Sequence, residues 1–378
     1  MTSHKYNNDY NSSYSIKTGL VLLGEHLILK ENRCLWIREG VVESIESFAS
    51  CNSDSLGGEH VVVLPQPANA HIHSADYAFP EYGIELDLDS LVSYPRGIKH
   101  QLLNKIGVED LENSILSSYR TAWSYGLGLI ADFREGGGRG CSIAKRALTK
   151  APEGMDVVIL GRPGPDWPKG CDGLGVSSPL DYSHDELSHI INGWDIRMTH
   201  VAENMKSRIA GDLEIALEYG FTGLVHGVYL DRNDLELIAS NKAGLVLCLR
   251  SNLWHGLGVP PLSDIMDIGI LFALGSDNMA WMTPDVWEEA RALLYLSRLR
   301  SKSIKLIDSV LQALFINGYR ILGKTPRTIS EGGRAYMLLF ADYDGVMSRA
   351  VNKKAAIIKR IGKGNILARI DEGIVSFL

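Results

Sequence analysis

Short runs of β-favouring residues alternate with turn residues at both ends of the chain. They cover Gly19–Gly24, Leu27–Lys30 and Cys34–Gly40 near the start, and Tyr336–Phe340, Ala355–Arg360 and Gly373–Phe377 near the end. Apolar runs bounded by turn residues in this way predict β-strands. Because both sets show the same pattern of short apolar runs and turns, we expect the two ends of the chain to form one small β-domain.

The middle of the chain has a different texture, in which apolar strands alternate with helices that carry recognisable caps. Ser183 and Glu186 form a capping box at the start of one helix, and Gly220 ends a second. Thr283 followed by Pro284 predicts the start of a third helix, with the proline at its first position. The order of elements indicates an α/β fold.

Eight candidate strands alternate with these helices. They are Val61–Leu64, Gly128–Phe133, Val157–Gly161, Gly173–Val176, Asp195–His200, Thr222–His226, Leu245–Cys248 and Leu271–Gly275. Eight strand and helix pairs over about 270 residues have the size and rhythm of a (β/α)₈ TIM barrel. We therefore predict a polar tail over 1–15, a β-sandwich domain from 16–62 plus 333–378, and a catalytic barrel over 63–332.

Composition and charge narrow the class of protein. The 378 residues are 45% hydrophobic and 22% charged, which excludes collagen-like, coiled-coil and wholly disordered chains. The net charge of −7 argues against a general binder of nucleic acid or of anionic membranes. The best apolar run, Gly19–Leu29, is interrupted by Glu25 and His26, so we expect no membrane-spanning segment.

The start of the chain and the cysteines bear on its location. Met1–Ser15 is polar and lacks an apolar core, so we do not expect a signal peptide. The five cysteines, at positions 34, 51, 141, 171 and 248, are widely scattered and contain no C-x-x-C motif. This pattern predicts neither a disulfide framework nor a thiolate zinc site, and it favours a cytoplasmic protein.

Candidate metal ligands follow four of the eight predicted strands. They are His71 and His73, His200, His226 and Asp277. Each histidine alone is also compatible with a buried core position, and Asp277 with a turn or a helix cap. Reactive groups in a TIM barrel lie at the carboxyl ends of the strands, so the shared position of these residues favours one metal site.

Five motifs occur in a fixed order along the chain. They are N-x-H-x-H at Asn69–His73, H-x-x-E at His200–Glu203, the histidine His226, the turn Cys248–Asn252, and S-D-N at Ser276–Asn278. In this order the sequence resembles the amidohydrolase superfamily, in the branch that contains cytosine, guanine and S-adenosylhomocysteine deaminases and chlorohydrolases. Two positions depart from the usual pattern of that superfamily: Gln66, between Pro65 and Pro67, and Leu249 in the turn. Both lie in loops and neither is a candidate ligand.

The resemblance implies a barrel with a small β-sandwich and assigns roles to the motifs. His71, His73, His200 and Asp277 would hold a divalent ion, with zinc preferred over iron. Asp277 would accept a proton from water, and Glu203 would carry it to the substrate nitrogen. His226 would polarise the amidine carbon or steady the developing tetrahedral centre. The fourth predicted strand, Gly173–Val176, offers no bridging lysine or glutamate, so we expect one metal ion and not two.

The substrate is less well defined by the sequence. Arg162, Asn252 and Trp281 follow predicted strands on the active face and are candidate substrate contacts, although surface and packing roles are equally compatible with Arg162 and Trp281. The acidic segment 74–91 is compatible with an amine-bearing substrate or with a solvated loop. We expect a small heterocyclic substrate and no nucleic-acid polymer or membrane as a partner. The sequence leaves open whether the protein forms a homo-oligomer.

The leading hypothesis for function is a metal-dependent hydrolase that deaminates a cyclic amidine, such as a nucleobase, a nucleoside or a related amino-heterocycle. A cyclic amidohydrolase or a hydrolytic dechlorinase on the same site is the alternative. A non-catalytic barrel is less favoured because every ligand position of the motifs is filled.

Overall fold

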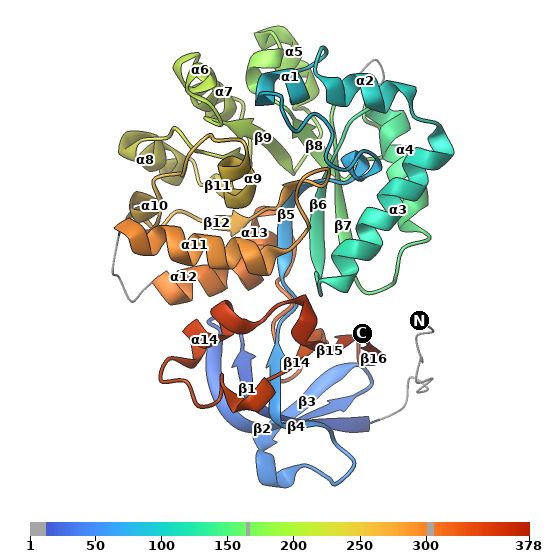
Figure 1. The fold of residues 1–378 in the computed structure, drawn as a ribbon, viewed down its shortest axis with the longest axis vertical. Helices are drawn as coiled ribbons and strands as arrows, with labels where there is room; N and C mark the ends of the chain where they lie inside the picture. Colours follow the sequence, from blue (N-terminus) through green and yellow to red (C-terminus); the bar gives the residue numbers. More distant parts are fainter. Residues whose placement is uncertain (1–12, 164–166, 301–305) are drawn as a thin grey trace.

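The computed structural model describes residues 13–163, 167–300 and 306–378. Figure 1 shows a barrel of strands surrounded by helices and, below it in that view, a smaller sheet in which blue and red segments lie together. The blue and red colours mark the two ends of the chain, so strands that are distant in the sequence share this sheet.

The barrel sheet contains nine parallel strands. They are β5 (Ala68–His73), β6 (Leu129–Arg134), β7 (Asp156–Gly161), β8 (Gly173–Val176), β9 (Arg197–Val201), β10 (Gly223–His226), β11 (Gly244–Leu247), β12 (Phe272–Leu274) and β13 (Asp277–Asn278). Their order is β12-β11-β10-β9-β8-β7-β6-β5-β13. The sheet closes on itself because β13 follows β12 in the chain and pairs with β5, with Asp277 opposite Ile72. The predicted barrel is confirmed as a TIM-like barrel.

Fourteen α-helices lie among the described residues, most of them around the barrel (Figure 1). They are α1 (Leu88–Val92), α2 (Ile98–Lys105), α3 (Val108–Ser124), α4 (Gly137–Leu148), α5 (His184–Ile190), α6 (Met205–Ile209), α7 (Asp212–Glu218), α8 (Arg232–Ser240), α9 (Leu249–Trp254), α10 (Leu262–Ile268), α11 (Val286–Arg300), α12 (Leu306–Gln312), α13 (Gly318–Ile321) and α14 (Lys353–Arg360).

The smaller sheet contains seven strands. They are β1 (Ser13–Leu23), β2 (Ile28–Arg38), β3 (Val41–Ser47), β4 (Leu56–Leu64), β14 (Met337–Ala341), β15 (Ile366–Asp371) and β16 (Ile374–Phe377), in the order β16-β15-β14-β4-β1-β2-β3. Of the predicted tail, residues 1–12 lie outside the described part and 13–15 belong to β1. The sandwich domain and the domain boundaries given above stay predictions.

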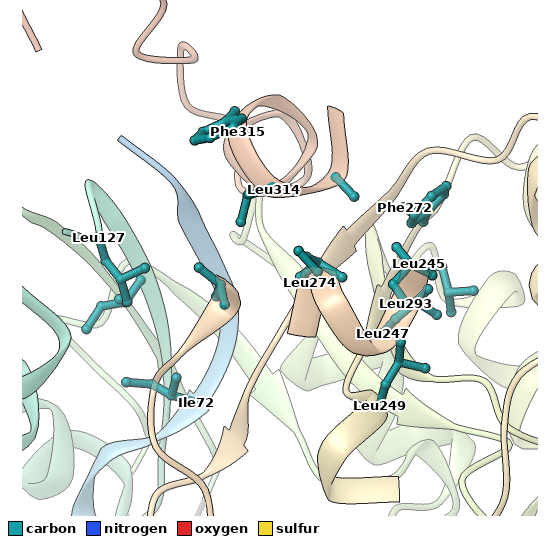
Figure 2. Packing of buried hydrophobic residues seen from close by; sticks show 14 of the residues in the cluster. Ile72, Leu127, Leu245, Leu247, Leu249, Phe272, Leu274, Leu293, Leu314 and Phe315 are labelled. Atoms are coloured by element: carbon teal, nitrogen blue, oxygen red, sulfur yellow. The ribbon is translucent and has the colours of Figure 1, made fainter. Parts of the chain in front are cut away.

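Alternation of side chains along the barrel strands separates two cores. Leu129, Ala131 and Phe133 of β6 belong to a small cluster inside the barrel, whereas Ile130 belongs to the large cluster between strands and helices. Figure 2 shows part of this outer layer, where Leu245 of β11 lies beside Leu293 of α11. The barrel interior is therefore packed with side chains, and a site can form only at the strand ends.

One predicted barrel strand belongs to the other sheet. Val61–Leu64 lies in β4, which pairs with β1 and β14, and the first barrel strand is β5. An apolar run of this kind fits a buried strand in either sheet, so the sequence does not determine its partners. Pro65 and Pro67 separate β4 from β5, since neither can donate a backbone hydrogen bond. The other seven predicted strands lie within two residues of the observed bounds.

Two further predictions are wrong in detail. The predicted strand Ala355–Arg360 lies in helix α14, which begins after Asn352, whose side chain accepts a hydrogen bond from the backbone of Ala355. Two basic residues in its last turn also favour a helix. Helix α11 does not begin at Pro284 but after Asp285, whose carboxylate accepts from the backbone amides of the second and third residues that follow it.

The prediction of unpaired cysteines is also wrong. Disulfides join Cys34 to Cys51 and Cys141 to Cys171, and both pairs have Cα atoms 5.4 Å apart. The partners are 17 and 30 residues apart in the sequence, so tertiary folding brings them together without a local motif. Cys248 is free and buried. The cysteines therefore no longer argue for a reducing compartment.

The described helices include none that is both long and apolar enough to cross a membrane.

A buried arginine joins the smaller sheet to loops at the base of the barrel. Arg369 of β15 is 0% exposed, and its guanidinium donates to the carbonyl of Leu127, to the carbonyl of Gly154 and to the carboxylate of Asp371. Leu127 lies two residues before the start of β6, and Gly154 lies two residues before the start of β7. The carbonyl of Leu127 is buried, so losing the hydrogen bond from Arg369 there would cost free energy.

We expect Arg369→Ala to lower the free energy of unfolding by about 1.5–3 kcal/mol, because it removes an ion pair with Asp371 and a donor to the buried carbonyl of Leu127. Urea unfolding followed by circular dichroism measures the change. Arg334→Ala is the matched control, since Arg334 is 62% exposed and pairs with Glu372 at 3.7 Å, and it should change the free energy by less than about 1 kcal/mol. Equal losses in both variants would contradict the assignment.

Candidate metal centre and active site

An irregularity in β5 turns two histidines toward the barrel axis. The register between β5 and β6 shifts between Asn69 and Ile72, so a bulge interrupts the alternation there. Ala68 and Ala70 belong to the inner cluster, while Ile72 belongs to the outer one. His71 and His73, on either side of Ile72, therefore face the inner side together.

Asn69 ties this bulge to the strand that closes the barrel. Its Nδ2 donates to the hydroxyl of Ser276 at 2.7 Å, and its Oδ1 accepts from the backbone amide of Ser276 at 3.1 Å. Gly275 allows the close approach, since a Cβ there would lie 2.8 Å from the Cβ of His71. The first and last barrel strands thus place their motifs side by side.

Nitrogen and oxygen atoms from three strands converge at one point. Nε2 of His71 lies 3.2 Å from Oδ1 of Asp277 and 3.3 Å from Nε2 of His200. Nε2 of His73 lies 3.5 Å from the same Asp277 oxygen. Nδ1 of His200 donates to the carbonyl of Ser177 at 2.8 Å, which leaves the Nε2 lone pair free for a ligand.

The spacing and chemistry of these atoms fit a divalent metal ion. Donor atoms at 2.0–2.1 Å around a tetrahedral zinc ion lie about 3.3 Å from one another, which matches the separations above. Three imidazoles and one carboxylate are ligands that zinc and iron accept. His71, His226 and Asp277 also hold ligand atoms within 4.8 Å of one another, so His226 borders the same point.

Burial keeps the imidazoles neutral and the neighbouring imidazoles help to keep Asp277 charged. Burial lowers the pKa of His71, and burial together with Lys99 lowers the pKa of His73 to about 3. Although burial raises the pKa of Asp277, its hydrogen bond with His71 and the nearby histidines hold that pKa well below its usual range. Neutral imidazoles and an ionised carboxylate are the protonation states that bind a metal.

Glu203 and His226 stand beside this cluster. Oε1 of Glu203 lies 3.6 Å from Nε2 of His226, and Nδ1 of His226 lies 2.8 Å from Oδ1 of Asn252. Burial and the negative charge of Asp277 raise the pKa of Glu203 against the opposing effect of His226. A carboxyl group with a raised pKa can hold and release a proton nearer neutral pH.

The short helix α9 supports both Asp277 and His226. Ser251 donates its hydroxyl hydrogen to Oδ2 of Asp277 at 2.5 Å, and the next residue, Asn252, contacts His226. The buried carboxylate of Glu289 on α11 accepts from the backbone amide of Leu249 at 3.0 Å, which fixes the first turn of α9. Helix α11 therefore anchors the turn that orients two residues of the site.

Three residues at the strand ends adopt left-handed backbone conformations. The φ angles are +48° at Ala202, +74° at His226 and +65° at Asp277. Such angles are strained for residues other than glycine and cluster at functional sites. Asn69 and Ser251 supply hydrogen bonds around the strained region.

A cavity of about 350 Å³ opens onto the cluster. Arg162 and Trp281, two of the candidate substrate contacts, line it, and Arg162 lies 3.4 Å from Asp181 and over the ring of Tyr94. Asn252 does not line it and lies behind His226. A second cavity of about 500 Å³ shares one wall with the first, formed by Leu88, Asp89, Asn204, Lys206, His255 and Trp281.

The acidic segment 74–91 has no single role. Asp76 is buried and pairs with Lys99 at 2.9 Å, and Asp87 accepts a hydrogen bond at the start of α1. Asp89 lines both cavities. Only part of the segment therefore faces space that a substrate can enter.

Sequence reasoning missed four residues that contact the site. They are Lys99, Glu135, Ser251 and Glu289. Ser251 lies in the turn Cys248–Asn252, and Glu135 follows the end of the predicted strand Gly128–Phe133 by two residues, so the position of both at a strand end was a usable signal. Lys99 and Glu289 lie on α2 and α11, where no local motif distinguishes them from surface residues.

The TIM-like barrel with this His/Asp cluster at its strand ends defines a barrel hydrolase as the class of protein. Residues 180–368 match the model of the amidohydrolase family. The chain belongs to the amidohydrolase family and is a hydrolytic enzyme that acts on carbon–nitrogen bonds. The resemblance recognised in the motifs is confirmed.

Known relatives extend over most of the chain. An uncharacterized protein of Methanocaldococcus jannaschii is 28% identical over 92% of this chain and 95% of its own length. A 5-methylthioadenosine/S-adenosylhomocysteine deaminase of Halothermothrix orenii is 23% identical over 84% of this chain and 79% of its own. A zinc-bound adenosine deaminase from Xanthomonas campestris superposes with a TM-score of 0.75 at 14% identity, over 96% of this chain and 92% of its own, which shows a common fold.

Proposed function

We propose that this protein is a metal-dependent deaminase of a cyclic amidine in an amino-heterocycle. The observation that carries the proposal is the convergence of three imidazole nitrogens and the Asp277 carboxylate at one point, with the Glu203 carboxyl group beside it. His71, His73, His200 and Asp277 would hold one divalent ion, and zinc is preferred over iron because its tetrahedral geometry fits the donor spacing. When bound, such an ion would lower the pKa of a coordinated water to about 7 and so supply a nucleophile at neutral pH.

The protein side chains move the protons of the reaction. Asp277 accepts a proton from the attacking water, since its carboxylate is ionised and is oriented by the Ser251 hydroxyl. Glu203 carries a proton to the leaving nitrogen, because an amine departs as ammonia only after it is protonated. The raised pKa of Glu203 suits this role.

His226 stabilises the carbon under attack. Its Nδ1–H donates to Asn252, so its Nε2 faces the space beside Glu203 and Asp277. Asn252 thus acts behind His226 and not on the substrate. Arg162 and Trp281 line the adjacent cavity and are the substrate contacts we propose.

The sizes and linings of the two adjacent cavities support a substrate larger than a free base. Their shared wall carries the polar groups of Asp89, Asn204 and Lys206, and the second cavity adds the apolar side chains of Leu86 and Trp254. An aminopurine nucleoside with an apolar substituent fits this arrangement, with its sugar at the polar shared wall and its substituent in the more apolar second cavity. Deaminases of 5-methylthioadenosine and S-adenosylhomocysteine among the relatives support the same substrate class.

We expect one zinc ion per purified chain, because the four ligands serve one ion and β8 carries no lysine or glutamate to bridge a second. Elemental analysis of the purified protein measures the ratio, and a chelator should remove both the ion and the activity. Two equivalents of metal, with one lost on changing a residue of β8, would contradict this ligand set.

We expect Glu203→Gln to keep its zinc and to lower kcat by at least about 100-fold, because the amide cannot transfer the proton. Steady-state kinetics and elemental analysis check the two halves. Glu112→Gln is the matched control, since Glu112 is a buried, ion-paired glutamate on α3 that lines neither cavity, and its kcat should not change. Loss of metal from Glu203→Gln would identify Glu203 as a ligand.

We expect ammonia release from at least one aminopurine nucleoside, with the amine replaced by a ring carbonyl. A panel of adenosine, 5-methylthioadenosine, S-adenosylhomocysteine, guanine and cytosine, assayed for ammonia with and without a chelator, provides the test. If cyclic amides or chlorotriazines are hydrolysed and no ammonia is released, the amidohydrolase or dechlorinase alternative replaces the deaminase assignment.

A further inference from the structure

A buried network of charged side chains contacts the metal-ligand candidates through His73. Lys99 of α2 is 4% exposed, and its Nζ lies 2.6 Å from Oε1 of Glu135 and 2.9 Å from Oδ2 of Asp76. The other oxygen of Glu135 accepts from Nη2 of Arg134 at 2.5 Å. None of these four side chains takes part in the reaction proposed above.

The two ring nitrogens of His73 face different partners. Nε2 points to the convergence point, 3.5 Å from Oδ1 of Asp277. Nδ1 lies 3.3 Å from Oε1 of Glu135 and 3.1 Å from Nζ of Lys99. His73 is therefore held between a group that only accepts hydrogen bonds and a group that only donates them.

These two partners favour opposite tautomers of the ring. A neutral imidazole carries one hydrogen, so Nε2 offers a lone pair to a metal only when the hydrogen is on Nδ1. Nδ1–H can donate to the carboxylate of Glu135 but not to an ammonium group. If Nδ1 instead accepts from Lys99, the hydrogen lies on Nε2, and His73 cannot act as a ligand.

We propose that Glu135 is a positioning residue that holds His73 with its proton on Nδ1, and that Lys99 opposes it by donating to the same nitrogen. This inference rests on the metal centre proposed above. A carboxylate behind a ligating histidine fixes the tautomer and ring orientation, and its loss commonly weakens metal binding 10–100-fold. Arg134 holds Glu135 in place from its other oxygen.

The same network also holds the backbone next to two ligands. The amide and hydroxyl of Ser74, directly after His73, donate to the carboxylate of Asp132 at 3.0 and 2.6 Å. Asn278, directly after Asp277, donates to Asp76 at 2.5 Å. A general loosening of this network would therefore disturb the site as well, and the test must separate that effect from the effect on the tautomer.

The test compares zinc affinity of the full chain and its variants by competition with a chelating dye. We expect Glu135→Gln to bind zinc 10–100-fold more weakly than the wild type, because the charged acceptor for Nδ1–H is lost. Lys99→Met should bind zinc no more weakly than the wild type, because it removes the competing donor. Glu112→Gln, which removes an ion-paired glutamate elsewhere, should leave the affinity unchanged.

Each result has a distinct meaning. Equal zinc affinity of the wild type and folded Glu135→Gln overturns the inference, and so does an equal loss in Glu135→Gln and Lys99→Met, which would indicate general disruption. A wild type that binds no zinc refutes the proposed metal centre instead.

A second measurement does not depend on the folding of any variant. Nitrogen-15 spectra of histidine rings in the metal-free wild type report which nitrogen of His73 carries the proton, with the ring assigned through its contact with Lys99, whose Nζ lies 3.1 Å from Nδ1. A proton on Nδ1 supports the inference, and a proton on Nε2 overturns it.

Discussion

Closure of the barrel between β5 and β13 is the constraint on which the site depends. The pairing sets Asp277 opposite Ile72, between the two histidines of β5, and Asn69 reinforces it with two bonds to Ser276. A sheet that stayed open at this edge would leave its first and last motifs on opposite edges. Donor atoms around one metal ion lie about 3.3 Å apart, so the metal centre we propose requires this closure.

The barrel supports the site from outside as well as from within. Strand ends supply the groups that meet at the centre, while helices supply the groups that orient them: Glu289 of α11 fixes the first turn of α9, and Ser251 of α9 bonds to Asp277. Lys99 on α2 lies behind His73, where we propose that it opposes the tautomer that binds a metal. Much of the structure around the site therefore consists of side chains that orient the few residues with reactive atoms.

The left-handed backbone at Ala202, His226 and Asp277 shows where the fold accepts strain. Each angle costs free energy that the surrounding structure must offset, and the packed barrel interior and the hydrogen bonds of Asn69 and Ser251 provide that support. The strained positions thus lie at the carboxyl ends of the strands, where the candidate ligands meet.

The sequence by itself determined the barrel rhythm, the family and the positions of His71, His73 and Asp277, because alternating strands and helices and short ligand motifs are local patterns. Only the tertiary structure decided that Val61–Leu64 joins the smaller sheet, since an apolar run does not specify its partner strand. The tertiary structure also decided which cysteines pair and that Lys99 contacts His73. No local sequence pattern records which distant residues the folded chain brings into contact.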